Sequence, residues 1–369
     1  MSNSSSMMLI GVGGGGSAIA RGIRRAFGED LRFLTVDTDA TMPSDDENFL
    51  LIGGDRLSGH GSGGNLVAAR LAAEDSINSI DPEIEGVRLA IVVTSLGGGT
   101  GGGATLEIVK RLDSLGIRTI VFATTPFSFE GEDRQRLARG VMPMIEEAAG
   151  ATFFIQLDKL VENADRFDDA MRRAVDTMAS AVTLFWRLVE KPGYLRLDAE
   201  RISHLVAKAG RGRFAAVTSR GPDRARDISD MLTRAPLLAA SSGPVRAILC
   251  GVLAGDDLRL SEISTISDGV RAAFGNQATS FELATVNDED TFSGRISVVL
   301  LLFEANAKDD DTEETPGGVM SNRRKKRPEK TLIVGPQGRG RFNNAEPTIW
   351  NSEDLDIPTF LRRGISLDV

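Results

Sequence analysis

Short apolar runs recur along the first part of the chain, separated by segments of mixed polarity. The runs are rich in valine, isoleucine and leucine, and their polarity does not alternate from one residue to the next. Such runs are typical of strands buried on both faces of a parallel sheet. Because the gaps between them suit helical crossovers, we predict a parallel sheet covered by helices. The six runs are residues 7–12, 31–36, 49–52, 88–94, 118–124 and 151–155.

A longer amphipathic pattern follows in residues 168–190. Its apolar side chains are spaced by three and four residues, which places them on one stripe of a helix. Pro192 and Gly193 come directly afterwards and end the pattern. We therefore predict a long central helix that buries its stripe against two domains. The stripe comprises Met171, Ala174, Val175, Met178, Ala181, Val182, Phe185, Leu188 and Val189.

The pattern changes twice more towards the end of the chain. Four apolar runs alternate with helical patterns in residues 200–305, which predicts a smaller α+β domain. Residues 306–345 are acidic and then basic, with too little apolar surface to offset the entropy of ordering, so we predict a disordered linker. We interpret the basic run at 323–327 as solvated linker rather than a contact for lipid or nucleic acid. Apolar residues return near the end, and residues 346–369 are predicted to be a docking peptide.

Composition narrows the functional classes. The net charge of −9, from 43 basic and 52 acidic residues, argues against general binding to nucleic acid. One cysteine excludes an internal disulfide, and two histidines disfavour a zinc site. No apolar run reaches the roughly 18–20 residues of a membrane span, and the start of the chain turns to glycine too early for a signal peptide. We expect a soluble, cytoplasmic protein with no metal site of its own.

Two glycine clusters carry the candidate chemistry. Residues 11–16 (GVGGGG) follow the first apolar run, and residues 97–103 (GGGTGGG) follow the fourth. Each lies where a strand is expected to end and a helix to begin, near Ser17 and near residue 104. Glycine allows backbone N–H groups to approach a polyphosphate, and a helix N-terminus adds free donors. Both clusters are therefore predicted to hold phosphates.

The first cluster alone leaves alternatives open. Gly11, Gly13 and Gly16 also satisfy the dinucleotide-binding pattern of a Rossmann fold. Asp37 and Asp39 lie near the offset at which that fold places its ribose-binding acid. A tight turn between strand and helix with no ligand is a further alternative.

The second cluster favours a phosphate-binding protein of another kind. Six glycines in seven residues around Thr100 would be entropically costly in a mere turn, and a second such loop is not part of a Rossmann half. The P-loop pattern is absent from the chain. A third loop, residues 59–65, is expected to close over a terminal phosphate, with His60 as a loop residue rather than a catalyst.

Six segments, in order, resemble the nucleotide loops of FtsZ in the tubulin/FtsZ family. They are GVGGGGSA (11–18), VDTDA (36–40), GHGSGGN (59–65), LGGGTGGGA (96–104), PFSFEG (126–131) and LDKL (157–160). The similarity continues through APLL (235–238) and AGDDLRLSEI (254–263). It ends with EDLDIPTFLRR (353–363), which resembles the family's C-terminal docking peptide. The resemblance thus covers residues 8–305 and the tail.

The resemblance implies an α/β fold in several parts. A Rossmann-like, parallel-sheet GTP-binding domain would occupy residues 1–167, and a long central helix residues 168–192. A smaller α+β C-terminal domain with the GTPase-activating loop would occupy residues 193–305, before the disordered tail.

The resemblance also implies a function in cell division. The chain would bind GTP or GDP, with Mg²⁺ accompanying GTP, and would assemble with itself into head-to-tail filaments. GTP hydrolysis at the subunit interface would drive polymer turnover. Residues 355–363, from Leu355 to Arg363, would bind membrane-adaptor division proteins at a midcell ring in the cytoplasm. No membrane span and no specific nucleic acid are implied.

Individual residues take roles by the same resemblance. Backbone N–H groups of both clusters would hold the phosphates, and Thr100 would add its hydroxyl. Glu130 would contact the ribose and Arg134 the nucleotide, while Met171 stands where the family usually has a phenylalanine against the base. Asp176 would accept from the guanine N1–H and 2-amino groups, a donor pair that adenine lacks. The full set is Gly13, Gly14, Gly15, Gly16, Asp39, Gly61, Gly63, Gly98, Gly99, Thr100, Gly101, Gly102, Gly103, Glu130, Arg134, Met171 and Asp176.

The loop that the family uses for hydrolysis departs most from the family pattern. The family has N-x-D-x-x-D after its Pro-Gly turn, and here Asp198 holds the middle position while Arg196 and Arg201 hold the outer two. An arginine cannot accept a proton from water, although it can neutralise charge on a terminal phosphate. The catalytic candidates are therefore Asp198, Glu200, Arg201 and Arg196. Hydrolysis is expected to be slow, or to depend on Asp198 with Glu200 substituting nearby.

Two further departures lie in the loops themselves. Gly102 replaces a threonine, which removes one hydroxyl, and Asp37 replaces an asparagine.

Three hypotheses follow from the sequence. The first is a GTP-hydrolysing polymer, the second a GTP-binding structural polymer with weak or absent hydrolysis, and the third an NAD-type Rossmann oxidoreductase.

Overall fold

A computed structural model describes most of the chain up to residue 304 and two short segments near the end. The described residues are 6–27, 31–41, 48–160, 166–191, 193–197, 199–207, 209–239, 243–275, 278, 280–304, 349–350 and 353–354. The predicted linker at 306–345 lies outside them, as does most of the predicted docking peptide. Within that peptide β11 (Ile349–Trp350) pairs with β12 (Glu353–Asp354), in a compact unit separate from the rest.

The first six strands form a parallel sheet, and they coincide with the six apolar runs of the sequence. Their order is β3-β2-β1-β4-β5-β6, and each pairs in parallel with its neighbours. The strands are β1 (Met7–Val12), β2 (Phe33–Asp37), β3 (Phe49–Leu51), β4 (Leu89–Ser95), β5 (Arg118–Thr125) and β6 (Ala151–Gln156). Because all of them run the same way, their carboxyl ends meet at one edge of the sheet.

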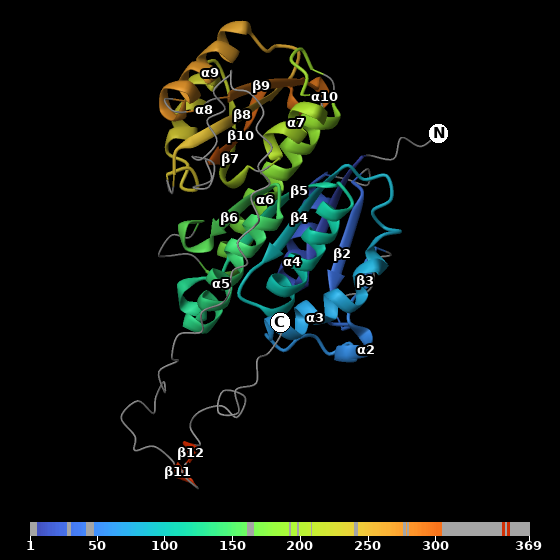
Figure 1. Ribbon diagram of the computed structural model, residues 1–369. Helices are drawn as coiled ribbons and strands as arrows, with labels where there is room; N and C mark the ends of the chain where they lie inside the picture. Colours follow the sequence, from blue (N-terminus) through green and yellow to red (C-terminus); the bar gives the residue numbers. More distant parts are fainter. Residues whose placement is uncertain are drawn as a thin grey trace, which may run out of the picture. The chain divides into compact units, whose positions relative to one another are not determined.

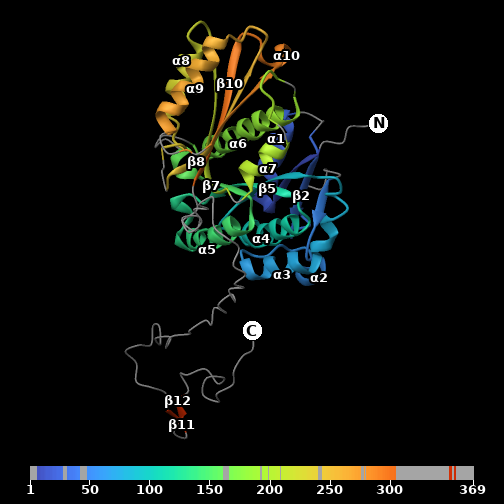
Figure 2. The same cartoon turned by 45° about the horizontal axis from the view of Figure 1, so that its top comes forward.

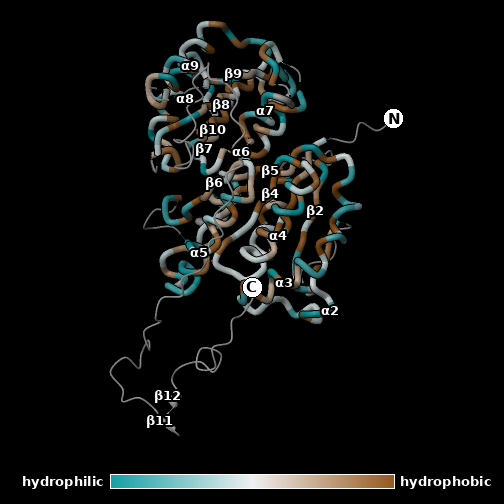
Figure 3. Tube along the Cα trace, viewed as in Figure 1, coloured by the Kyte–Doolittle hydropathy of each residue, from teal (hydrophilic) through white to brown (hydrophobic). Residues whose placement is uncertain are grey.

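Helices cover both faces of this sheet, as Figures 1 and 2 show. Leu9 of β1 packs into one apolar cluster with α1 and α6, whereas the next residue, Ile10, packs into another with α3, α4 and α5. Figure 3 shows the apolar positions concentrated along the strands. The helices are α1 (Gly13–Phe27), α2 (Gly54–Leu57), α3 (Leu66–Ser76), α4 (Gly99–Ser114), α5 (Glu132–Ala148) and α6 (Phe167–Glu190), with 3₁₀ turns η1 (Ile77–Ile80), η2 (Ser128–Glu130) and η3 (Leu157–Leu160).

The second half of the described chain adds four strands in the order β7-β10-β8-β9. β10 is antiparallel to β7 and β8, whereas β9 is parallel to β8. Residues Ala151 to Phe153 of β6 pair with Gly210 to Gly212 of β7, so one sheet of ten strands runs through both halves. The elements are α7 (Ala199–Val206), β7 (Gly210–Arg220), α8 (Arg224–Thr233), β8 (Val245–Ala254), α9 (Leu260–Phe274), β9 (Ser280–Asn287), α10 (Glu289–Phe292) and β10 (Arg295–Glu304).

The long helix α6 lies where the 168–190 pattern predicted one. Its Val182 and Trp186 are buried in a cluster that also holds Ile91 of the first half and Leu301 of the second. A second cluster packs α8 and α9 on the other face of β7, β8 and β10. The division of the chain at residues 167 and 192 stays a prediction.

Two helices start earlier than the sequence indicated. α1 begins at Gly13 rather than near Ser17, and α4 begins at Gly99 rather than near residue 104. Glycine has a low helix propensity, so the apolar pattern could not mark these starts. Close packing explains the glycines: a Cβ at Gly16 would lie 2.4 Å from the Val93 carbonyl oxygen, and one at Gly101 would lie 2.1 Å from that of Ser95.

Substituting a glycine at the contact between α3 and α4 tests this packing. A Cβ at Gly103 would lie 2.4 Å from the Leu66 carbonyl oxygen and 2.8 Å from the Arg70 nitrogen, so Gly103→Ala forces backbone apart. We expect it to lower the free energy of unfolding by about 1–3 kcal/mol. Gly140→Ala in α5 is the matched control, because a Cβ there meets nothing within 4 Å. It should stabilise the protein by about 0.5–1 kcal/mol. Chemical denaturation measures both, and equal effects would contradict the explanation.

Candidate nucleotide-binding site

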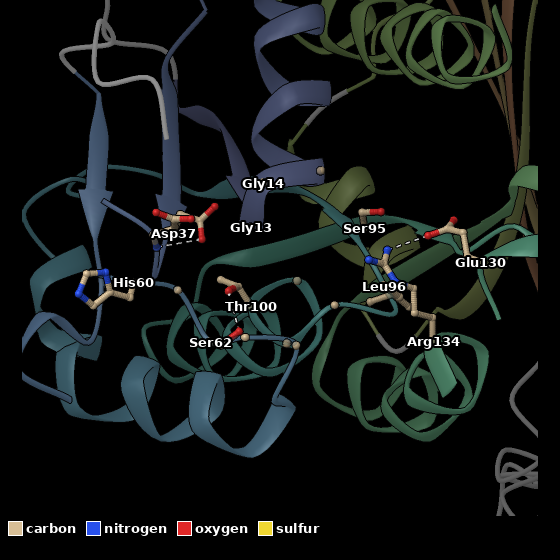
Figure 4. Close-up of a pocket in the computed structure, with 18 of the residues that line it drawn as sticks. Gly13, Gly14, Asp37, His60, Ser62, Ser95, Leu96, Thr100, Glu130 and Arg134 are labelled. Carbon is tan, nitrogen blue, oxygen red and sulfur yellow. Dashed lines mark hydrogen bonds and ion pairs between the residues drawn. The ribbon is translucent and has the colours of Figure 1, made fainter. Parts of the chain in front are cut away.

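A cavity of about 880 Å³ lies at the carboxyl edge of the parallel sheet. The loops that follow β1, β2 and β4 all contribute to it, and η2 and α6 close one side (Figure 4). Its lining residues are Gly13, Gly14, Gly15, Asp37, Asp39, His60, Gly61, Ser62, Gly63, Gly64, Ser95, Leu96, Gly98, Gly99, Thr100, Gly101, Glu130, Arg134, Leu157 and Met171. The site is thus built mainly from backbone.

The two glycine clusters touch each other across the floor of this cavity. Gly13 has a left-handed φ of 73°, and a Cβ on it would lie 2.9 Å from the Gly101 nitrogen. The Thr94 hydroxyl donates to the Gly101 carbonyl oxygen at 2.8 Å and fixes the start of α4. Both α1 and α4 therefore point their first turns, with unpaired N–H groups, towards the same space. Such paired N-termini can hold an anion with several oxygens.

The third glycine loop reaches the same place through hydroxyl contacts. Thr38 Oγ1 and Thr100 Oγ1 are 2.7 Å apart, and Ser62 Oγ lies 3.3 Å from Thr100 Oγ1. The Gly61 N–H donates to the Thr38 carbonyl oxygen at 3.1 Å. Left-handed φ angles occur at Ser58, Gly59, Gly61, Gly63 and Gly64. The loop can make this turn because four of these five residues are glycine.

The ionisable groups fall at two ends of the cavity. At one end burial raises the pKa of Asp37, although the N–H groups of Thr38 and Asp39 donate to its carboxylate. The hydroxyl and N–H of Thr41 lower the pKa of Asp39, which is half-buried. At the other end Arg134 Nη1 pairs with Glu130 Oε2 at 2.7 Å, while Glu130 Oε1 accepts from the Phe127 N–H at 2.9 Å.

Most residues predicted from the sequence line this cavity, and four do not. Gly16 packs against Val93 and Thr94, and Gly103 packs against Leu66. A Cβ at Gly102 would meet Leu66 and Val141, so a threonine side chain there would start towards α3 and α5 and not into the cavity. Asp176 is exposed on α6 and is not among the lining residues.

Sequence reasoning missed several lining residues. Asp37, Ser62, Gly64, Ser95, Leu96 and Leu157 line the cavity, as does His60, which had been assigned to the loop alone. Ser62 and Gly64 belong to the 59–65 loop, so their neighbours could have indicated them. Ser95 and Leu96 directly follow β4, at the edge where a parallel sheet collects its ligands.

Of the predicted hydrolysis residues, Arg196, Glu200 and Arg201 are described, and none of the three lines the cavity. Asp198 is outside the described residues, and Glu200 falls in the first turn of α7. Arg201 Nη1 pairs with Glu282 Oε2 of β9 at 2.6 Å, whereas Arg196 is exposed. Leu195 and Thr285 of β9 exchange two hydrogen bonds, of 3.0 and 2.8 Å, which fix the loop before α7.

The described residues contain no group of three or more His, Cys, Asp or Glu that could hold a metal ion. Of the helices described, none has the length and apolarity to cross a lipid bilayer.

Comparison with known proteins agrees with this geometry. Residues 6–165 match the model of the "Tubulin/FtsZ family, GTPase domain". The chain is 29% identical to the cell division protein FtsZ of Pseudomonas putida, over 96% of this chain and 88% of that one. It is 27% identical to the FtsZ of Buchnera aphidicola, over 98% of each.

Solved structures show the same fold at lower identity. An FtsZ dimer from M. jannaschii superposes with a TM-score of 0.73 at 22% identity, covering 80% of this chain and 87% of that one. A GTPγS-bound CetZ2 protofilament from Haloferax volcanii gives 0.68 at 20% identity, covering 80% and 92%. The tubulin/FtsZ GTPase-domain model thus matches the half of the chain that carries the cavity, and the similarity to FtsZ relatives extends over nearly all of the sequence.

Proposed function

We propose that this chain is a GTP-binding and GTP-hydrolysing protein of cell division that assembles with itself into filaments. The observation that carries the proposal is the shared cavity, in which two glycine clusters and two helix N-termini face one space. The matched family is named for a GTPase domain, and the curated relatives are named cell division proteins. Similarity to this family argues against the third hypothesis, an NAD-type Rossmann oxidoreductase.

The phosphates would lie between the two clusters. Gly13, Gly14 and Gly15 from α1, and Gly98 to Gly101 from α4, would donate backbone N–H groups to phosphate oxygens, with Thr100 adding a hydroxyl. Gly16, Gly102 and Gly103 support these donors by allowing the helices to pack closely. Gly61 and Gly63 of the third loop, with Asp39 beside them, would enclose the terminal phosphate.

The nucleoside would lie at the other end of the cavity. Glu130 is held by Arg134 and by the Phe127 N–H, so its carboxylate is oriented for a ribose hydroxyl. Met171 and Leu157 form an apolar wall suited to one face of a base. Asp176 lies five residues after Met171 on α6. Its carboxylate would accept hydrogen bonds from the edge of the guanine, beyond the apolar wall.

Two exposed regions suit a head-to-tail contact between copies. Tyr194 is 74% exposed beside Leu195 in the loop before α7, and Val67 is 62% exposed on α3, which directly follows the cavity loop 59–65. Two different surfaces that meet in this way make a heterologous contact, which does not close and so builds a filament. The similar structures include one described as a dimer and one described as a protofilament.

Hydrolysis at this contact would use residues from the loop and α7. Asp198 is the group that can accept a proton from water, with Glu200 near it in sequence. Arg196 would neutralise charge on the terminal phosphate. Arg201 would act indirectly, because its pair with Glu282 ties the start of α7 to β9. The two arginines favour a second candidate function, a GTP-binding polymer whose hydrolysis is weak.

The site of action would be the division ring in the cytoplasm, as the names of the FtsZ relatives suggest. Residues 355–363, which lie outside the described residues, would bind adaptor proteins at the membrane. Their composition, with one acid, several apolar residues and two arginines at the end, suits a short docking peptide.

Nucleotide-dependent assembly is the first test. Purified protein should bind GTP and GDP but not ATP, and light scattering should rise on addition of GTP and not of GDP. With GTP the signal should decay as nucleotide is consumed, whereas with GTPγS it should persist. A signal that persists equally with both would favour the structural polymer. No binding of guanine nucleotide by a folded protein would contradict the proposal as a whole.

Substitution of Asp198 tests the hydrolysis step. Asp198→Ala should lower the rate of phosphate release at least about tenfold, because it removes the acceptor for the water proton. GTP affinity and assembly with GTPγS should be unchanged. Asp113→Ala is the matched control, since Asp113 is an exposed acid near the end of α4. Equal phosphate release by wild type and Asp198→Ala would rule out the assigned role.

A further inference from the structure

Asp37 occupies the point at which the two glycine clusters meet. It is the last residue of β2, and the preceding pair in the register is Val36 with Val12 of β1. Asp37 is therefore the strand neighbour of Gly13, the first residue of α1. Its side chain lines the cavity, although the residue is only 4% exposed (Figure 4).

The residue after Asp37 reaches the second cluster. Thr38 Oγ1 lies 2.7 Å from Thr100 Oγ1 of α4, and the Gly13 Cα region touches the backbone of Gly101. A polyphosphate held by both helix N-termini must pass next to the Asp37 carboxylate. A negative ligand would then face a buried negative side chain.

The surroundings of Asp37 offer little to neutralise it. One carboxylate oxygen, Oδ1, accepts from the N–H groups of Thr38 at 2.7 Å and Asp39 at 3.3 Å. Arg21 of α1 attracts the carboxylate at a distance, whereas Asp39 repels it. His60 of the 59–65 loop forms an isolated β-bridge with Asp39. Within the described part of the chain, no cation forms an ion pair with Asp37.

We propose that Asp37 takes up a proton when the nucleotide's phosphates bind. The inference rests on the proposed nucleotide function. It identifies Asp37 as a residue on which the affinity for nucleotide depends. The proton comes from solvent and goes to the free oxygen of the carboxylate, and no other bond changes. The neutral acid then offers an O–H donor to a phosphate oxygen where the carboxylate would have repelled it.

The direction of the pH dependence follows from the charges. Burial already raises the pKa of Asp37 in the free protein, and phosphate charge beside it raises that pKa further. Nucleotide affinity should therefore be constant below the free-protein pKa and fall by up to about tenfold per pH unit above it. It should become constant again above the pKa of the complex. The terminal phosphate of the nucleotide also titrates, so the wild-type profile alone does not isolate Asp37.

Two variants that differ only by the isosteric change Asp37→Asn isolate the contribution of Asp37. The background is His60→Gln, which removes the nearby imidazole, and the test variant adds Asp37→Asn, which keeps the shape and abolishes the titration. GTP binding is measured by calorimetry from pH 5 to 8, in EDTA and in two buffers of different ionisation enthalpy. Asp113→Asn on the same background is the remote control.

The expected result is a difference between the two curves. The His60→Gln protein should take up more protons than the double variant, by up to about one per GTP, and its affinity should fall more steeply with pH. The Asp113→Asn control should match the background. Identical proton uptake and identical slopes with and without Asp37 would overturn the inference while leaving the proposed function intact. Absence of GTP binding in every folded variant would instead count against the proposed function.

Discussion

The close approach of main chain to main chain, made possible by glycine, is the constraint on which the site depends. Gly13 contacts Gly101 across the cavity floor, and Gly16 and Gly101 lie against the carbonyl oxygens of β4. A single Cβ at any of these positions would overlap backbone, which cannot rotate away as a side chain can. The two helix N-termini therefore converge on one space because the first turns of both helices lack side chains that would separate them.

The sheet could be predicted from the sequence because its strands are buried on both faces. Within the run at 88–94, residues 89–93 are all apolar, since Ile91 and Val92 point into different clusters and both avoid water. The long helix was equally visible, because its apolar stripe from Met171 to Val189 repeats through roughly five turns. The starts of α1 and α4 were not visible, since glycine carries no side chain and gives no periodic signal.

From the residues alone, the candidate site was predictable where one residue type carries the chemistry, whereas Glu130, Arg134 and Met171 were assigned by resemblance to the family. The glycine clusters indicated phosphate because that chemistry uses backbone, and backbone position follows from strand ends. Asp37 was considered as a substitution and as a ribose-binding acid of a Rossmann fold, but not as a neighbour of the phosphates, since its place beside Gly13 depends on the register between β1 and β2. Gly102 was interpreted as the loss of a hydroxyl contact, yet the direction of its missing side chain depends on how α4 packs on α3.

The strand order of the first six strands is also that of a dinucleotide-binding fold, so topology alone could not decide between NAD and GTP. The order of the loop motifs along the chain, together with their residue types, favoured GTP over NAD.

The pairing of β6 with β7 has a mechanical consequence. It joins the nucleotide-binding half to the second half through hydrogen bonds between strands, in addition to the packing around α6. Rotation of one half against the other would break Ala151 and Phe153 away from Gly210 and Gly212, so the subunit should behave as a stiff block under load. In a filament of such blocks, curvature and its relaxation would be confined to the joints between neighbouring copies.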